Sequence, residues 1–170
     1  VEYKFSTIKI LCPTQGVEMI PELTMNVLTT GFGHVGTASL DKKSYHTDTM
    51  GVSVDQQNDT ISCFVKSSIA EEFLKNVNKT KKISFYLGLE THEAYNFKGT
   101  LIETYDLGSE ELSQSENFRK SFIDKMKSMG LPEDGIKKIF GNPPDKGLKF
   151  KVEKIFKQTP GPEAGQELSF

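Results

Sequence analysis

The sequence predicts a mainly β protein, a β-barrel with peripheral helices, from three observations. Short segments with alternating apolar residues recur along the chain, and turn-forming residues separate them. Few segments show the apolar period of a helix. The 12 Phe and 5 Tyr, with no Trp, fit a β-rich core. A length of 170 residues is enough for one such core, so we expect a single domain over residues 1–170.

Composition and charge exclude several partners and locations. The formal charge of −2 and the pI near 6.0 provide no basic footprint for binding nucleic acid. No apolar run approaches a membrane span and no signal sequence is visible, so we expect no membrane partner and a cytoplasmic location. There are two cysteines, Cys12 and Cys63. Because Cys63 lies on the apolar face of a predicted strand, it indicates a buried free thiol in a reducing compartment.

The chain is expected to begin with a short helix and a hairpin. Residues 1–19 form either an arm or a short strand, and the sequence does not decide between them. A short helix is predicted around Pro21, a residue that suits the first helical turn, and Gly31 ends it. Two strands follow, at 35–40 and 45–54, and pair as a hairpin.

A glycine motif lies between this helix and the first strand. Gly31-Phe-Gly-His-Val-Gly36 matches the dinucleotide-binding fingerprint G-x-G-x-x-G. That fingerprint requires a strand before it and a helix starting within it. Here a helix precedes the motif and a strand follows it, so we reject a dinucleotide-binding βαβ unit.

The centre of the chain alternates between strand and helix. The segment 60–65 is rich in β-formers, and the segment 83–89 alternates apolar and polar residues. Between them the apolar residues lie along one side of a helix. Ser68 and Glu71 have the spacing of a capping box, which predicts that this helix begins at Ser68.

The corner where this strand meets this helix is a candidate phosphate site. Lys66, Ser67 and Ser68 bring an ammonium group and two hydroxyls next to the free N–H groups of a helix start. An ordinary capped helix with a solvated lysine explains the same residues more simply. The local pattern alone favours that simpler interpretation.

Two further strands are predicted in the second half of the chain. The segment 94–105 reads as a long strand, and the segment 148–158 as the last one. Gly99 lies in the middle of the first of these. A glycine there suggests a close approach by another backbone or by a ligand.

A helical insertion is expected over about residues 107–146. The segment 115–129 is an amphipathic helix, and Pro132 starts a shorter one that ends at Gly141. The apolar side of the longer helix indicates core packing rather than a cofactor site. The sequence does not decide whether the insertion at about residues 107–146 is a lid, a dimer element or simple padding.

The chain shows no self-sufficient catalytic machinery. None of the three histidines, His34, His46 and His92, has a partner at metal-ligand spacing, so we expect no metal site. No nucleophile elbow and no phosphate-binding Walker loop is present. If the protein is an enzyme, a cofactor must perform its chemistry.

The order of elements resembles the FMN-binding split-barrel superfamily, the pyridoxamine 5'-phosphate-oxidase-like and flavin-reductase-like proteins. The resemblance covers about residues 20–106 and 147–165. The segments that carry it are Val35-Gly-Thr-Ala-Ser-Leu-Asp, Thr60 to Ser68, Phe73-Leu-Lys-Asn, Tyr95-Asn-Phe-Lys-Gly-Thr and Phe156-Lys-Gln-Thr-Pro-Gly-Pro-Glu-Ala-Gly.

This resemblance implies a six-stranded antiparallel split barrel that binds FMN in grooves at a homodimer interface. In the superfamily the strand-to-helix corner holds the phosphate, and polar groups of the preceding strands border the flavin ring. The implied cofactor-binding residues are Thr37, His46, Thr47, Asp48, Thr49, Lys66, Ser67, Ser68, Lys98, Gln158 and Thr159.

The implied function is that of an FMN-dependent oxidoreductase acting on a small organic substrate. The flavin would carry out the redox chemistry, and the protein would bind and shield it. A different class remains open: a non-enzymatic carrier or sensor of flavin or haem built on the same barrel. The sequence identifies no catalytic residue and names neither the substrate nor the electron donor.

Overall fold

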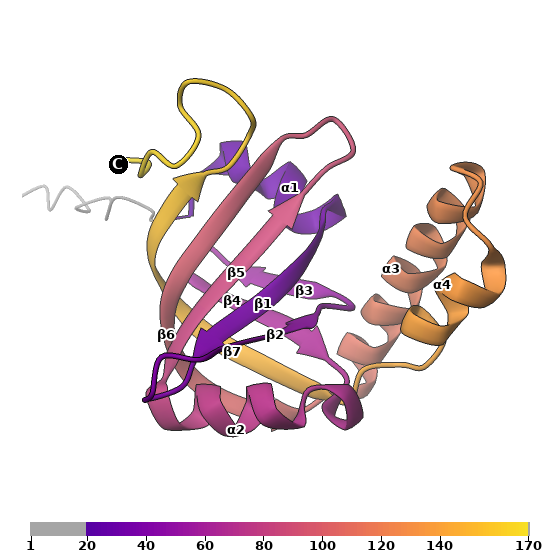
Figure 1. The fold of residues 1–170 in the computed structure, drawn as a ribbon, viewed down its shortest axis with the longest axis horizontal. Helices are drawn as coiled ribbons and strands as arrows, with labels where there is room; N and C mark the ends of the chain where they lie inside the picture. Colours follow the sequence, from indigo (N-terminus) through magenta and orange to yellow (C-terminus); the bar gives the residue numbers. More distant parts are fainter. Residues whose placement is uncertain (1–19, 170) are drawn as a thin grey trace, which may run out of the picture.

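The structure, a computed structural model, describes residues 20–169. Within them a seven-stranded antiparallel sheet curves around the core, with helices at its ends and side (Figure 1). The strands are β1 (Phe32–Ala38), β2 (Ser44–Asp48), β3 (Val52–Asp55), β4 (Thr60–Val65), β5 (Lys82–Gly88), β6 (Ala94–Asp106) and β7 (Lys146–Lys157). The helices are α1 (Met25–Thr30), α2 (Glu71–Thr80), α3 (Ser109–Ser128) and α4 (Glu133–Phe140), and the short 3-10 helices are η1 (Glu22–Thr24) and η2 (Ser67–Ile69).

The short connection between the two edge strands requires the sheet to curve into a split barrel. The strand order is β2-β1-β5-β6-β7-β4-β3, so the two edge strands β2 and β3 are neighbours in sequence. Only residues 49–51 join them, a link that can span at most about 14 Å. The two edges must therefore lie close together, and this leaves a sheet that is rolled up but not closed by hydrogen bonds.

The seventh strand corrects the predicted single strand over 45–54. That segment breaks at residues 49–51, and its two halves lie on opposite edges of the sheet. Gly51 has a φ of +148°, which side chains rarely adopt, and a Cβ there would lie 2.6 Å from the Phe64 ring. The predicted six-stranded barrel thus has seven strands because one strand changes edge.

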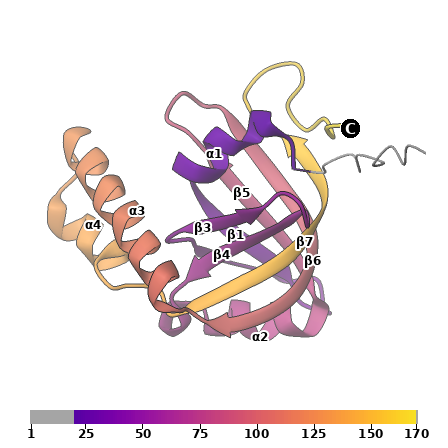
Figure 2. The same ribbon diagram turned by 180° about the vertical axis from the view of Figure 1, so that it is seen from behind.

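The core fills the barrel and is closed at each end by a helix. Phe85, Phe97 and Phe150 are fully buried inside the barrel, and the rings of Phe85 and Phe150 meet edge to face at 6.3 Å. The α1 helix covers one end of the barrel and α2 the other, as the two views in Figures 1 and 2 show. Cys63 is a buried free thiol in this core, as predicted.

The start of α2 differs from the prediction. The α-helix begins at Glu71 rather than at Ser68, and no side chain caps it. Residues Ser67–Ile69 form a separate 3-10 turn instead. The predicted capping box is therefore wrong, because the Ser67 groups bond to a distant carboxylate and the chain turns once more before the helix.

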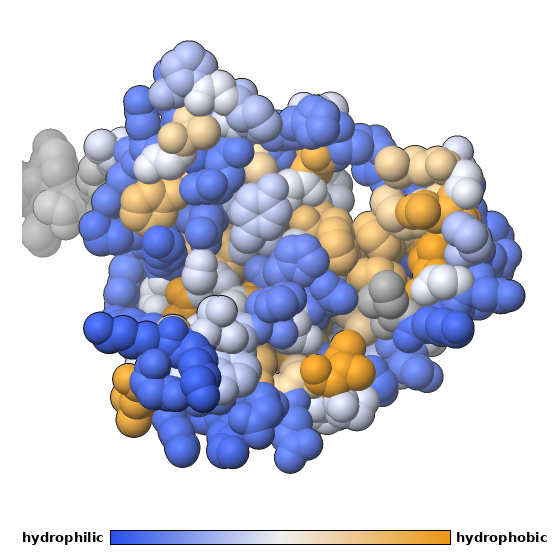
Figure 3. Space-filling model, in the orientation of Figure 1, coloured by the Kyte–Doolittle hydropathy of each residue, from blue (hydrophilic) through white to orange (hydrophobic). Residues whose placement is uncertain are grey.

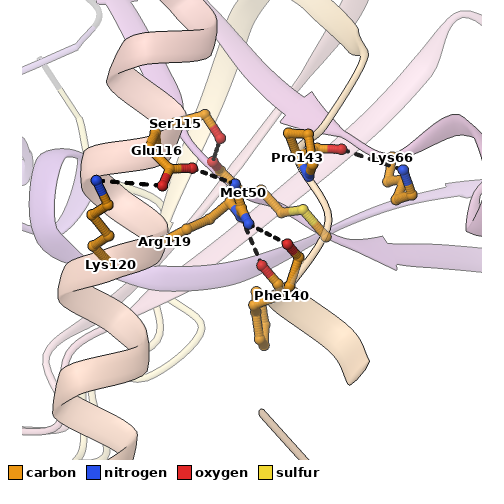
Figure 4. Close-up of polar contacts among 9 residues, drawn as sticks. Met50, Lys66, Ser115, Glu116, Arg119, Lys120, Phe140 and Pro143 are labelled. Carbon is orange, nitrogen blue, oxygen red and sulfur yellow. Dashed lines mark hydrogen bonds and ion pairs between the residues drawn. The ribbon is translucent and has the colours of Figure 1, made fainter. Parts of the chain in front are cut away.

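Helices α3 and α4 stand beside the barrel as a hairpin (Figures 1 and 2). Ser115 of α3 donates a hydrogen bond to the Met50 carbonyl at 2.6 Å. The buried Arg119 donates to the carbonyls of Phe140 and Gly141, at 2.7 and 2.6 Å, and pairs with Glu116 (Figure 4). These bonds fix both helices to each other and to the link between β2 and β3.

Most other elements lie where the sequence predicts them. The short first helix is confirmed and ends before Gly31, and the glycine motif that follows lies in β1 rather than in a nucleotide-binding turn. The long strand through Gly99 and the last strand are confirmed as β6 and β7. The prediction for residues 1–19 lies outside the described residues.

Candidate functional site

A groove crosses the outer face of the sheet and forms the candidate site. It has a volume of about 570 Å³, within the range of ligand pockets. We call it the sheet groove. Its lining residues all lie in β1, β2, β5, β6 and β7: Gly36, Thr37, Ala38, Ser44, Tyr45, His46, Lys82, Ile83, Ser84, Lys98, Gly99, Glu153 and Lys154.

Strand register places the polar groups of the groove in one row. His46 pairs with Gly36, and Gly36 pairs with Ser84. Ser84 pairs in turn with Lys98, and Lys98 with Lys154. Because side chains alternate between the two faces of a strand, this row points outward while its neighbours fill the core. Five strands therefore contribute to one outward row, which is polar except at Gly36.

Lys98 is the unpaired cation of this row. Lys154 pairs with Glu167 at 2.9 Å, and Lys82 lies 3.8 Å from Glu153. Among the described residues Lys98 has no carboxylate partner, and its ammonium group lies over the Phe156 ring at 4.7 Å from the centroid. Lys98 and Lys154 lie directly opposite each other on adjacent strands, and their like charges repel. A bound anion beside Lys98 would relieve that repulsion.

A histidine and a carboxylate lie one row further along the sheet. His34 of β1 pairs with Asp48 of β2, and the Nδ1 atom of His34 lies 2.7 Å from a carboxylate oxygen of Asp48. Both side chains are partly exposed. The ring of His34 also meets the ring of His46 edge to face at 6.2 Å, which joins this pair to the end of the sheet groove.

The structure brings three of the implied cofactor residues together. Thr37, His46 and Lys98 all line the sheet groove. The Thr37 hydroxyl donates to the Lys82 carbonyl at 2.6 Å and so ties the end of β1 to the start of β5. Of the implied cofactor residues, these three line the sheet groove together.

The implied residues of β2 and its following link divide between the two faces. Asp48 points outward to His34, as described above. Thr47 and Thr49 are buried, and the Thr49 hydroxyl donates to the Gly33 carbonyl at 3.0 Å. Strand alternation separates them. Thr47 and Thr49 therefore do not line the sheet groove.

The predicted phosphate corner holds a carboxylate of the chain itself. The backbone N–H of Ser67 donates to Asp145 at 2.7 Å, and the Ser67 hydroxyl donates to the other oxygen of the same carboxylate. Lys66 donates to the Pro143 carbonyl at 3.4 Å (Figure 4), and Ser68 is exposed. Burial raises the pKa of Asp145, but its bonds from Ser67 outweigh that effect and lower it. The corner anchors the segment that returns from α4 to β7.

Gln158 and Thr159 lie at the other end of the sheet, after β7. Both backbone N–H groups donate to the Ala94 carbonyl, at 2.7 and 3.1 Å, and the Thr159 hydroxyl accepts from the Ala94 N–H. Ala94 begins β6, four residues before Lys98. These bonds hold the end of β7 against β6 and do not reach into the sheet groove.

Sequence reasoning missed Ser84 and Lys154 of the groove, and the pairing of His34 with Asp48. Ser84 and Lys154 join the row through the pairing of strands that are far apart in sequence, whereas His34 and Asp48 oppose each other through the register of the β1–β2 hairpin. No local pattern marks such a residue. Alternation within β5 and β7 does show which residues point outward, and that is the one signal available.

Two findings limit the kinds of site on the described residues. Within residues 20–169 no group of three or more His, Cys, Asp or Glu side chains is placed to hold a metal ion. No helix in that range has the length and apolar character needed to cross a membrane.

The comparisons with known proteins identify the fold. HupZ from Group A Streptococcus matches with a TM-score of 0.52 and 17% identity, over 86% of this chain and 100% of HupZ. A candidate pyridoxamine 5'-phosphate oxidase from Lactobacillus delbrueckii matches with a TM-score of 0.52 and 14% identity, over 84% of this chain and 97% of that one. No family model and no curated protein matches the sequence. The chain therefore has the split-barrel fold of pyridoxamine 5'-phosphate-oxidase-like proteins, which confirms the resemblance at the level of the fold.

Proposed function

We propose that the chain binds FMN in the sheet groove and acts as a flavin-dependent oxidoreductase on a small organic substrate. The observation that carries the proposal is the ammonium group of Lys98, which lacks a carboxylate partner among the described residues and lies in an open groove of ligand size. The split-barrel fold, shared with a candidate pyridoxamine 5'-phosphate oxidase, supports the same cofactor.

The floor of the groove suits a flat ring. A Cβ at Gly36 would meet no atom closer than 3.5 Å, so packing does not require a glycine at this position. Its missing side chain leaves a gap in the row between His46 and Ser84. Ser84 and Thr37 line the groove with hydroxyls, and Lys98 supplies a positive charge for the phosphate. When bound, FMN would supply the redox chemistry, and these residues would hold and orient it.

The groove also suits a homodimer. In the row beside the polar row, Tyr86 lies on the outward face of β5 with 41% of its surface exposed, and Asn96 of β6 separates it from the half-buried Phe156 of β7. Within residues 20–169, β2 and β3 are the edge strands of the sheet, and a partner that covers such edges protects them from unwanted pairing. We propose that a second copy packs against this face and shields the flavin from water.

The phosphate has two candidate positions, and a double substitution distinguishes them. The corner at Lys66 to Ser68 already donates to Asp145, so a phosphate there must displace a carboxylate. We therefore expect Lys66→Ala with Ser67→Ala to change the dissociation constant of FMN by less than about threefold, the scale of a lost surface interaction. Quenching of flavin fluorescence during titration measures it.

The control for this experiment is Asp145→Asn, which keeps the shape of the corner and removes its negative charge. If the corner holds the phosphate, the double variant must bind FMN at least tenfold more weakly, and Asp145→Asn must bind it more tightly. That pair of results would show that the phosphate binds at the corner rather than at Lys98. Circular dichroism of both variants checks that they keep the secondary structure of the unmodified protein.

A carrier or sensor of flavin or haem is the second candidate, and the exposed imidazole of His46 in the groove favours it, because imidazole is a common haem ligand. Adding reduced nicotinamide cofactor to the flavin-loaded protein distinguishes the oxidoreductase from the carrier or sensor. Rapid bleaching of the bound flavin supports the oxidoreductase. Bound flavin that does not react with it supports the carrier.

A further inference from the structure

An apolar pocket lies beside the sheet groove, between β1 and the helical hairpin. Its volume is about 440 Å³, toward the lower end of the range of ligand pockets, which suits a compact ligand. Figure 3 shows apolar residues gathering between the barrel and these helices. We call it the aromatic pocket, and its lining includes Phe32, His34, Asp48, Phe122, Leu131 and Phe140.

Three phenylalanine rings that pack against one another form part of the wall of this pocket. The rings of Phe32 and Phe122 stack at 4.5 Å, and Phe140 packs against both, at 5.3 and 4.6 Å. Arg119 fixes the end of α4 through the Phe140 and Gly141 carbonyls. A pocket with flat, preorganised aromatic walls favours a flat ligand, because ring faces and edges offer it stacking contacts at little entropic cost.

One polar pair interrupts the apolar lining. Because a carboxylate can only accept, the Nδ1 atom of His34 carries the proton between them, and in that tautomer the Nε2 atom is an acceptor. A ligand that reaches His34 therefore gains from a hydroxyl that donates to Nε2. His34 also contacts His46 of the sheet groove, so a ligand in the aromatic pocket lies next to whatever the groove binds.

We infer that the aromatic pocket binds a planar molecule of fused rings that carries a hydroxyl group, with the rings against Phe32 and Phe122 and the hydroxyl at His34. That this molecule is the substrate of the flavin rests on the proposed function. Its binding to the aromatic pocket does not. The inference goes beyond the sheet groove, because the helical hairpin supplies most of the residues that line the pocket and no residue of that hairpin lines the groove.

The test uses 2-naphthol and naphthalene as probes on the flavin-free protein. The two differ by one hydroxyl, and the intrinsic fluorescence of each reports its binding. We expect saturable binding of both, with 2-naphthol about five- to tenfold tighter, the effect of one hydrogen bond. The variant His34→Phe keeps a ring at this position. It should bring 2-naphthol to the affinity of naphthalene and leave naphthalene unchanged.

A second pair of variants tests the place of binding. Leu131 lines the pocket and is 48% exposed, whereas Leu112 of α3 is 38% exposed and is not among its lining residues. Leu131→Asp puts a charge at the pocket and should weaken both probes by about tenfold or more. Leu112→Asp should leave both unchanged. Neither leucine is a core residue, so both variants should fold.

Two results would overturn the inference: equal affinity of the probes for the unmodified protein, or equal binding by the Leu131→Asp and Leu112→Asp variants. FMN titration of the same proteins is read separately. If the protein binds 2-naphthol but not FMN, the proposed function is contradicted and the inference about the aromatic pocket is supported. If it binds FMN but not 2-naphthol, the inference about the aromatic pocket is contradicted and the proposed function is supported.

Discussion

Replacing Gly99 with alanine should lower the free energy of unfolding by about 3 kcal/mol, the upper end of the cost of overpacking. A Cβ at Gly99 would lie 1.9 Å from the Lys151 carbonyl oxygen, which is backbone and cannot rotate away. The β6 and β7 strands would have to separate where the register already shifts, between Lys98 and Gly99. Because Lys98 sits on the same bulge, the substitution should also weaken FMN binding.

Urea unfolding followed by circular dichroism measures this loss. The matched control is Gly135→Ala, since a Cβ at Gly135 in α4 meets no atom within 4 Å. Alanine in a helix is favoured over glycine, so this control should be neutral or up to about 1 kcal/mol more stable. Equal stability of the two variants would show that β7 does not approach β6 so closely.

Replacing Lys98 with methionine should raise the dissociation constant of FMN by about tenfold to a hundredfold, the worth of a charge-assisted hydrogen bond. Methionine keeps the apolar stem that packs near Phe156 and removes only the charge. Stability should hardly change, because Lys98 is exposed. Quenching of flavin fluorescence measures the affinity.

The control is Lys79→Met, which removes an exposed charge of α2 that does not line the sheet groove. It should leave the affinity within about twofold at physiological salt, where distant charges are screened. If both variants weaken FMN equally, the effect is one of net charge. The phosphate would then not lie at Lys98.

Much of the fold follows from local sequence. The alternation in β5 and β7 and the apolar side of α2 were sufficient to predict those elements, because each has one face on the core. The mid-strand glycine at 99 predicted a close backbone approach, and Lys151 supplies it. The rejection of the dinucleotide motif also follows from local order, since Gly31 to Gly36 runs into a strand.

The wrong predictions share a cause that local sequence does not contain. Residues 45–54 have the pattern of one strand, and only the barrel shows that the chain changes edge at Gly51. Ser68 and Glu71 have the spacing of a cap, but Asp145, far along the chain, holds the neighbouring Ser67. In both cases a tertiary contact overrides the local preference.

The candidate site was less predictable than the fold. A groove on the outside of a sheet is defined by which residues oppose each other across strands, and register depends on the whole barrel. Thr37, His46 and Lys98 were implied by the resemblance and share the groove. Ser84 and Lys154 complete it and could not be found before the register was known.

The most direct test of the account is the visible absorption spectrum of the freshly purified protein, followed by titration with FMN. We expect either a yellow protein or tight, saturable binding at one FMN per chain. A colourless protein that does not bind FMN would contradict it and leave the split barrel without its proposed cofactor. A haem-like absorption band would instead support the carrier or sensor.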